Sequence, residues 1–250
     1  MRSATALVLG LICWSSVAAA EELRRATVWD LKLGQPVSAQ PAPDQFRGFA
    51  CGSNGGPPRQ PLIGWDDFRR CPAEADGLRE VYFEYDDEYE YIARARDLPR
   101  EVSRWAGTTE AGFPVVISGL FDAAGILAAI RVVTDSRPEY RNDITEANLH
   151  KRADAYLFGG LMAARHGIDG ARDCVALPAA AGESAVGSLL VKQACELIDP
   201  SGGRKVIVQA SYFRKIGQSG VNPQLPTQLT QGQFESSARL ELRQAAPGSQ

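Results

Sequence analysis

Two stretches in the first half of the chain alternate apolar and polar residues in the manner of β-hairpins. The first, residues 78–94, allows two registers. A loop of Asp86 and Asp87 alone would mix apolar and charged side chains on both faces, whereas a loop of residues 86–88 gives one apolar, aromatic-rich face. We expect the second register, because a slip of one residue turns every side chain to the opposite face. The pairs that it predicts are Tyr85 with Tyr89, Phe83 with Tyr91 and Val81 with Ala93.

Residues 114–135 predict a second hairpin. Asp122 and Gly125 suit the first and last positions of a type I turn. Pairing outward from this turn gives one fully apolar face and sets Val116 against Arg131 on the other. We therefore expect this hairpin near the centre of its sheet, buried on one face and half covered on the other. The pairs expected on the buried face are Phe121 with Ile126, Gly119 with Ala128, Ile117 with Ile130 and Val115 with Val132.

The second half of the chain predicts one long helix and further strands. The helix begins after Asn142 or Asp143, which suit the N-cap, and ends at His166, before Gly167. Residues 183–198 fit both a helical stripe and a strand, and we favour the strand because it then pairs apolar residues across a turn at residues 199–203. These pairs are Leu197 with Val206, Cys195 with Val208 and Val191 with Tyr212.

Two more strands are expected at residues 205–215 and 234–243. In the last of these, alternation directs Ala238, Leu240 and the other even-numbered residues inward and places Glu241 in water.

These elements predict an α+β fold, in which antiparallel hairpins or a meander pack against one longer helix. Residues 21–136 form the N-terminal half with its two hairpins, and residues 137–243 add the helix and the later strands within the same domain. The pattern does not decide between one sheet and two. Residues 244–250 are expected to form a disordered tail.

Residues 1–20 have the features of a secretory signal peptide. Arg2 precedes an apolar run that ends at Cys13, and small residues follow up to Ala20, where we expect cleavage. The run is too short for a comfortable membrane span, and no later segment approaches the roughly 20 apolar residues that a span needs. Lipidation at Cys13 is the less favoured alternative, because Ile12 stands where a small residue should precede a lipidated cysteine. We expect a periplasmic or secreted protein.

Four cysteines remain after cleavage, and four cysteines allow three pairings. Proximity favours Cys51 with Cys71 and Cys174 with Cys195. Each disulfide would close a loop of about 20 residues, which the chain-entropy model values at roughly 3 kcal/mol. A zinc site of four thiolates is less favoured, because the chain has no C-x-x-C pair and export favours oxidation.

Composition and motifs argue against several functions. Without Arg2 the chain has 26 of its 27 Lys and Arg residues against 30 Asp and Glu, a net charge of about −4, and no basic stripe for nucleic acid. His150 and His166 would lie on opposite faces of the helix, so they cannot share a metal. Residues 182–187 resemble a G-x-S-x-G elbow but have Val186 at the second glycine. The glycine-rich residues 51–58 lack the lysine of a phosphate-binding loop.

Carboxylates are the remaining chemical groups that cluster. In the expected register five of them meet at the tip of the first hairpin, and Glu84 lies directly opposite Glu90. Hard cations such as Ca²⁺ bind oxygen ligands in such clusters and would relieve this repulsion. The five candidate ligands are Glu84, Asp86, Asp87, Glu88 and Glu90.

The sequence therefore favours a non-enzymatic exported protein without a cofactor, which binds a periplasmic protein or another ligand. One alternative is a protein that binds a calcium-type cation through residues 84–90. Another is a hydrolase of unrecognised class, because catalytic groups can converge from distant positions.

Overall fold

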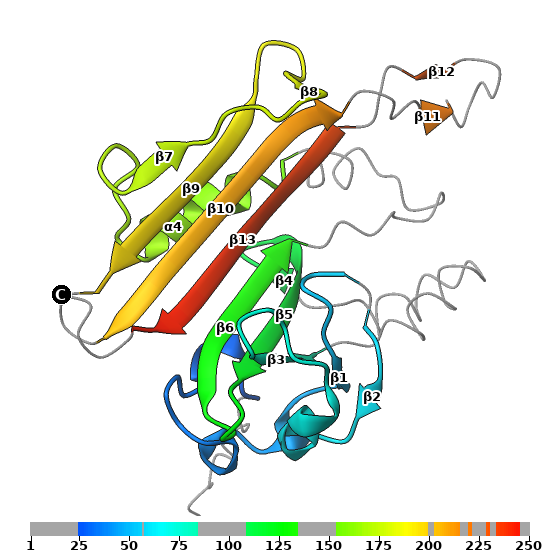
Figure 1. The fold of residues 1–250 in the computed structure, drawn as a ribbon, viewed down its shortest axis with the longest axis vertical. Coiled ribbons are helices and arrows are strands. Elements are labelled where there is room, and N and C mark those ends of the chain that lie inside the picture. The colour runs from blue at the N-terminus through cyan, green and yellow to red at the C-terminus, as the bar shows by residue number, and fades with distance from the viewer. Residues whose placement is uncertain are drawn as a thin grey trace, which may run out of the picture.

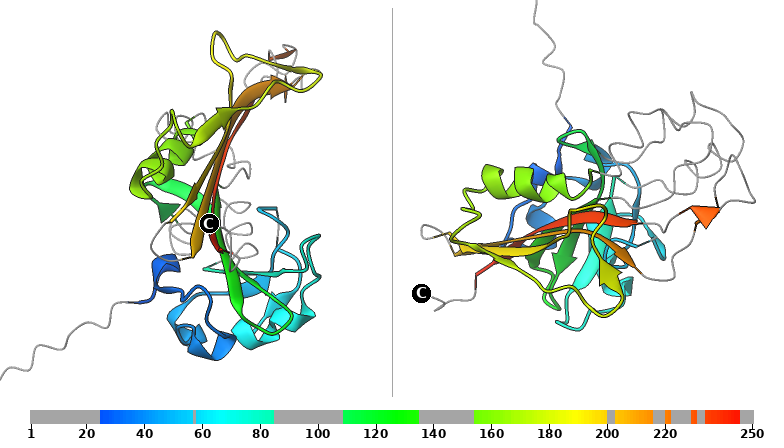
Figure 2. Two further views of the ribbon diagram at one scale, coloured as in Figure 1. Left: turned by 60° about the vertical axis from the view of Figure 1, so that its left-hand side comes forward. Right: turned by 90° about the horizontal axis from the view of Figure 1, so that it is seen from above.

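The computed structural model describes residues 25–56, 58–84, 109–134, 154–199, 203–215, 220–221, 229–230 and 234–245. Within these ranges the chain forms a long, twisted antiparallel sheet with one α-helix against one of its faces (Figures 1 and 2). The expected α+β class is therefore a loose description, because the sheet dominates. The expected signal peptide lies outside the described residues. So do residues 246–250 of the expected tail, whereas Gln244 still belongs to the last strand.

The strands of the N-terminal half are β1 (Phe49–Cys51), β2 (Pro61–Leu62), β3 (Arg79–Phe83), β4 (Thr109–Glu110), β5 (Phe113–Phe121) and β6 (Leu127–Thr134). Those of the C-terminal half are β7 (Cys174–Ala176), β8 (Glu183–Ser184), β9 (Val191–Ile198), β10 (Arg204–Lys215), β11 (Gly220–Val221), β12 (Leu229–Thr230) and β13 (Phe234–Gln244). The α-helix is α4 (Leu157–Arg165), and the 3₁₀ helices are η1 (Val28–Asp30), η2 (Val37–Ala39), η3 (Pro43–Gln45) and η4 (Trp65–Arg70).

One continuous sheet joins the two halves of the chain. Its order is β2-β1-β3-β5-β6-β13-β10-β9-β7, with β4 beside β5 and β8 beside β10, while β11 and β12 form a separate pair. β13, the last strand in the sequence, lies between β6 and β10 and pairs with both. The sequence did not decide between one sheet and two. Because β13 pairs with strands of both halves, the structure has one sheet.

The first predicted hairpin is wrong in its pairing. β3 lies in the interior of the sheet, with β1 along one edge and β5 along the other. Phe83 therefore faces Phe49 and Ile117, and no edge remains for Tyr91. The predicted partner residues 85–94 themselves lie outside the described residues. Local alternation suggested that β3 pairs with the next segment of the chain, whereas in the sheet it pairs with the more distant strands β1 and β5.

The second predicted hairpin is present, with its register shifted by two residues. β5 and β6 are joined by the expected turn, in which the amide of Gly125 donates to the carbonyl of Asp122. Ile117 faces Val132 rather than Ile130. A shift of two residues preserves the faces, so Ile117, Ile130 and Val132 remain on the buried side as predicted. Near the turn, however, Leu127 enters the core in place of Ile126.

A longer loop and a β-bulge each contribute one residue to this shift. Phe121 faces Leu127 rather than Ile126, so the loop has one residue more than expected. The register changes between Leu120 and Phe121, and Ala128 becomes the extra residue on β6. Arg131 consequently faces Ser118 on β5, instead of the predicted Val116.

The predicted pairing in the C-terminal half is confirmed. Residues 191–198 form the strand β9, and Leu197, Cys195 and Val191 face the three β10 partners that the sequence favoured. β13 follows the expected alternation at Ala238, Leu240 and Leu242, which are buried. The predicted exposure of Glu241 to water is wrong, because only 5% of this residue is exposed.

The helix α4 packs across β10 and β13 (Figure 2). It ends close to the predicted position, with His166 as the C-cap and Gly167 at a φ of 73°. The expected earlier part, residues 142–153, lies outside the described residues. Gly159 permits the close approach to the sheet, because a Cβ there would come within 2.9 Å of the Cβ of Ala210.

One apolar core runs along the covered face of the sheet. It joins the aromatic residues of the N-terminal half to Phe158 and Met162 of α4 and to the strands of the C-terminal half. Two disulfides join Cys51 to Cys71 and Cys174 to Cys195. This is the pairing that proximity in sequence favoured. The first disulfide joins β1 to the end of η4 within the core, and the second joins β7 to β9.

Candidate functional site

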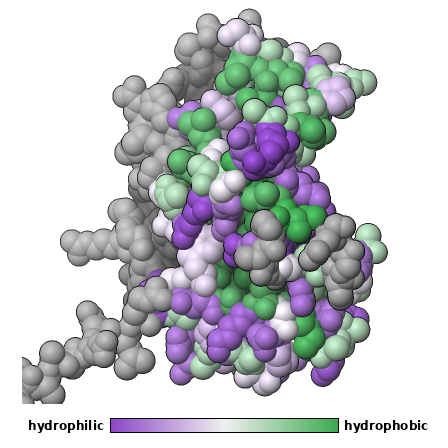
Figure 3. Space-filling view, turned by 90° about the vertical axis from the view of Figure 1, so that its left-hand side faces the viewer, coloured by the Kyte–Doolittle hydropathy of each residue, from purple (hydrophilic) through white to green (hydrophobic). Residues whose placement is uncertain are grey.

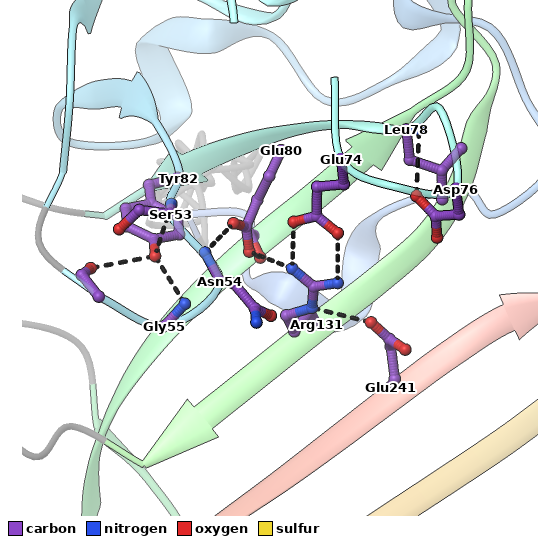
Figure 4. A network of polar contacts seen from close by, with 12 residues as sticks. Ser53, Asn54, Gly55, Glu74, Asp76, Leu78, Glu80, Tyr82, Arg131 and Glu241 are labelled. Atoms are coloured by element: carbon purple, nitrogen blue, oxygen red, sulfur yellow. Dashed lines mark hydrogen bonds and ion pairs between the residues drawn. The ribbon is translucent and has the colours of Figure 1, made fainter. Parts of the chain in front are cut away.

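A cluster of charged residues is buried on the opposite face of the sheet (Figure 4). Its centre is Arg131 of β6, which is 2% exposed. A row across the sheet places Tyr82, Ser118, Arg131 and Glu241 next to one another on four strands. This row continues the polar side of strands whose other side fills the apolar core.

Each nitrogen of the Arg131 guanidinium donates to a carboxylate. Nη1 lies 2.8 Å from Glu74 and 2.9 Å from Glu80, Nη2 lies 3.0 Å from Glu74, and Nε lies 2.8 Å from Glu241. Burial lowers the pKa of Arg131, but the carboxylates outweigh this effect and raise the pKa well above its ordinary value. Arg131 is therefore a fixed positive charge that holds three segments of the chain together.

Glu80 of β3 binds on two sides and is 2% exposed. One carboxylate oxygen accepts from Arg131 and from the Ser118 hydroxyl at 2.8 Å. The other accepts from the backbone amide of Asn54 at 2.6 Å. Gly52 lies so close that a Cβ there would overlap the side chain of Glu80. The glycine is therefore required for this packing.

Residues 53–56 form the glycine-rich loop that resembled a phosphate-binding loop, and they bind groups of the protein itself. The amides of Ser53 and Gly55 donate to the hydroxyl of Tyr82 at 3.0 and 2.8 Å, and that hydroxyl donates to the carbonyl of Gly56. Burial, followed by the charge of Glu80, raises the pKa of Tyr82. The loop amides thus bind the Tyr82 hydroxyl and, through Asn54, the carboxylate of Glu80.

Two further arginines of β13 enclose this cluster. Arg239 donates to the backbone and side chain of Asn54, and Arg243 contacts both Asp76 and Glu241 at 3.0 Å. Burial would raise the pKa of Glu241, but Arg243 and Arg131 hold it below its ordinary value of 4.5. We call this set the Arg131 cluster, and its members are Glu74, Asp76, Glu80, Arg131, Arg239, Glu241 and Arg243. Its carboxylates bind Arg131 and Arg243, and Arg239 binds Asn54, so its chemistry is structural.

The predicted cation site is only partly described. Glu84 lies at the end of β3, where it accepts from the amide of Arg47 at 3.1 Å and lies 3.8 Å from the guanidinium of Arg25. Asp86, Asp87, Glu88 and Glu90 lie outside the described residues. Among the residues that the structure describes, no group of three or more His, Cys, Asp or Glu has the arrangement of a metal site. The cation hypothesis therefore stays a prediction.

His166 and Ser184 lie in different parts of the molecule. His166 caps α4 beside Trp29, whose ring centroid is 6.0 Å away. Burial and the nearby Arg204 and Arg165 lower the pKa of His166. The neutral form of His166 is thus favoured at pH 7. Ser184 belongs to the short strand β8 rather than to a nucleophile elbow.

An exposed apolar segment stands apart from these charges. Residues 175–190, named here the apolar arm, comprise the end of β7 and the connection to β9, which extends to the upper end of the molecule (Figure 1). Figure 3 shows apolar side chains gathered there. Glu183 is the single charged residue in the arm. The large apolar side chains that are exposed are Val175 (60%), Leu177 (41%), Leu189 (41%) and Leu190 (37%).

The arm is anchored at several points. The carboxylate of Glu183 accepts from Lys192 at 2.6 Å and from the amide of Ala180 at 2.7 Å, so the one charge of the arm is neutralised by its own anchor. β8 pairs with the end of β10, Val186 and Leu189 exchange two backbone hydrogen bonds, and the Cys174–Cys195 disulfide joins the base to β9. The apolar residues are thus presented in one arrangement.

No family model, curated protein or solved structure matches this chain. The helix within the described ranges is too short to cross a membrane.

Proposed function

We propose that this protein is a non-enzymatic binding module that engages another protein through its apolar arm. The observation that carries the proposal is the arm itself, which exposes four large apolar side chains and neutralises its one charge internally. Contiguous exposed apolar surface is typical of interaction sites in folded proteins. The expected signal peptide and the two disulfides support action outside the cytoplasm, as a periplasmic or secreted protein.

The anchoring of the arm favours binding. Association costs free energy when loops must be ordered at the interface, so a segment that is already held loses less on binding. Burial of Leu177, Leu189 and Leu190 against a partner would contribute about 25 cal/mol for each Å² of apolar surface removed from water. The arm therefore supplies both a driving force and a defined shape.

The Arg131 cluster supports the non-enzymatic part of the proposal, because its carboxylates are poorly suited to catalysis. Its carboxylates accept hydrogen bonds from arginines, a hydroxyl and backbone amides, and Glu241 has a lowered pKa. A general acid at neutral pH requires a raised carboxyl pKa and access to substrate. The cluster is therefore better suited to holding the sheet together than to hydrolysis.

Site-specific photocrosslinking in producing cells tests the proposal. A photoreactive residue is placed at Leu190 in the arm and, as the matched control, at the exposed Gln209 on the open face of β10. We expect an adduct of one defined mass from position 190 and none from position 209. The same adduct should disappear when Leu177→Ser and Leu189→Ser are introduced beside the probe. Equal adducts from both positions, or none from position 190, would refute the proposal.

A further inference from the structure

The helix α4 is apolar on its outer side as well as on its inner side. Phe158, Gly159 and Met162 are buried against the sheet. On the opposite side Leu157 and Leu161 are 46% and 48% exposed. No charged residue occurs between Tyr156 and Ala164. A helix that is apolar all round is usually covered on both sides, so a second packing partner is expected for this one.

The exposed residues of α4 form one continuous stripe. Positions 157, 160, 161 and 164 follow the i, i+3, i+4, i+7 spacing of a single helical face. They alternate large and small side chains, and a Cβ added to Gly160 would meet nothing within 4 Å. The stripe therefore has two leucine knobs and two hollows, at Gly160 and Ala164.

We propose that two copies of this protein associate through these stripes, with their α4 helices antiparallel about a two-fold axis. When the axis passes between residues 160 and 161, Leu157 of one copy faces Ala164 of the other, and Leu161 faces Gly160. Every knob then meets a hollow, which is the self-complementarity that a two-fold interface requires. The parallel arrangement would instead set leucine against leucine and glycine against glycine.

The charges at the two ends of α4 favour the same orientation. Asp154 precedes the helix and Arg165 lies in its last turn. In the antiparallel pair each Asp154 lies within about 3 Å along the axis of the partner's Arg165, because each residue advances 1.5 Å. Arg165 is 45% exposed in its side chain while it contacts Glu110 and the ring of Trp29, so it is held in place and remains accessible. A parallel pair would bring like charges together.

The size of the stripe sets the expected strength. One short helix face buries less than the roughly 800 Å² per partner of a standard stable interface, so we expect a weak dimer with a dissociation constant in the micromolar range or above. This inference does not depend on the apolar arm, because α4 covers a face of the sheet whereas the arm extends from its upper end (Figure 2).

Sedimentation velocity of the mature protein, from about 5 µM to 1 mM, tests the association. We expect the sedimentation coefficient to rise with concentration in the parent protein. Leu161→Glu should weaken the dimer at least about tenfold by placing a charge in the seam. Ile198→Glu is the matched control, because Ile198 is 42% exposed on β9, and it should leave the dissociation constant unchanged. The arm variant with Leu177→Ser and Leu189→Ser should also dimerise normally, which separates this test from that of the proposed function.

Cysteine crosslinking tests the orientation. In the antiparallel pair the residues at position 157 of the two copies are separated by about 10 Å along the helix axis. Residue 157 of one copy instead lies opposite residue 164 of the other. A mixture of Leu157→Cys and Ala164→Cys proteins should therefore crosslink on oxidation, and neither variant should crosslink alone. Monomer at every concentration, including the case in which α4 is covered by a different protein, would overturn the proposal. Crosslinking of each variant alone would overturn it too, because that is the result of a parallel pair.

Discussion

The Arg131 cluster and the apolar arm invert the usual distribution of residues in opposite ways. The cluster buries arginine and glutamate on the central strands, whereas the arm exposes leucine and valine at the end of the sheet. Lys, Arg, Asp and Glu are rarely buried unless they are paired. In the cluster each buried charge has a partner within the chain. In the arm the exposed leucines have no such cover among the described residues.

This difference shows which of the two regions is available for function. A buried charge costs free energy unless opposite charges and hydrogen bonds compensate it, and Arg131, Glu80 and Glu241 compensate one another. Nothing further is required from outside the molecule. An exposed apolar surface keeps its driving force until another surface removes it from water. The Arg131 cluster thus stabilises the fold, and the apolar arm is the candidate surface for binding a partner.

The largest expected effect comes from breaking the cluster. Arg131→Met should lower the free energy of unfolding by about 3–5 kcal/mol, because it leaves buried carboxylates without their counter-charge. Urea denaturation at pH 7 measures this change. Lys205→Met removes a partly exposed pair with Glu196 and should cost at most about 1 kcal/mol. An equal loss of unfolding free energy in the two variants would show that the buried charges of the Arg131 cluster do not stabilise the fold more than an exposed ion pair does.

Two adjacent glycines of α4 provide the next comparison. Gly159→Ala should destabilise the protein by about 1–3 kcal/mol, since the new methyl group collides with Ala210. Gly160→Ala should instead stabilise it by about 0.5–1 kcal/mol, because the site is open and alanine favours the helix. Thermal unfolding at low protein concentration should therefore show shifts of opposite sign. Shifts of the same sign would mean that α4 does not pack on the sheet through Gly159.

The sequence predicted those parts of the fold in which neighbours in sequence are neighbours in space. The β9–β10 pairing and the β5–β6 hairpin have short connections, and their alternation was enough to identify the faces. β3 was misassigned because its partners β1 and β5 come from distant parts of the chain. The two-residue error in β5–β6 came in equal parts from a loop one residue longer than expected and from a bulge at Ala128, and alternation reveals neither.

The Arg131 cluster was missed for a related reason. Its signal is a charged residue inside an apolar strand, as at Glu80, Arg131 and Glu241. Arg131 was assigned to a half-covered face and Glu241 to water. Only the cross-strand register shows that Arg131 and Glu241 are adjacent. The apolar arm was equally inconspicuous, because alanine, leucine and valine in a sequence suggest a core until the structure shows that they are exposed.

Acid should weaken the cluster in a defined range of pH. Burial acts to raise the pKa values of Glu241 and Asp76, but contacts that include Arg243 lower them below their ordinary values of 4.5 and 3.8. A lowered pKa in the folded state stabilises the protein above the unfolded value, and the stabilisation is lost as the pH falls through the folded value. The urea midpoint should thus be steady above about pH 5 and fall below about pH 4.5.

Glu241→Gln is the control for this pH dependence. It should start from a lower midpoint at pH 7 and show a shallower fall toward pH 3, because one of the titrating groups is absent. A fall as steep as that of the parent protein would assign the acid sensitivity to other carboxylates.

The smallest expected effect is in the arm. The pair Leu177→Ser and Leu189→Ser should change the free energy of unfolding by less than about 0.5 kcal/mol, because exposed side chains contribute little to the folded state. Leu240→Ser on β13, which is 0% exposed, should cost more than about 3 kcal/mol and serves as the opposite extreme. Chemical denaturation compares the two directly. If the arm variant is as unstable as Leu240→Ser, the leucines of the arm belong to the core, and the loss of a crosslink would reflect unfolding. If it is stable, that loss reports the surface itself.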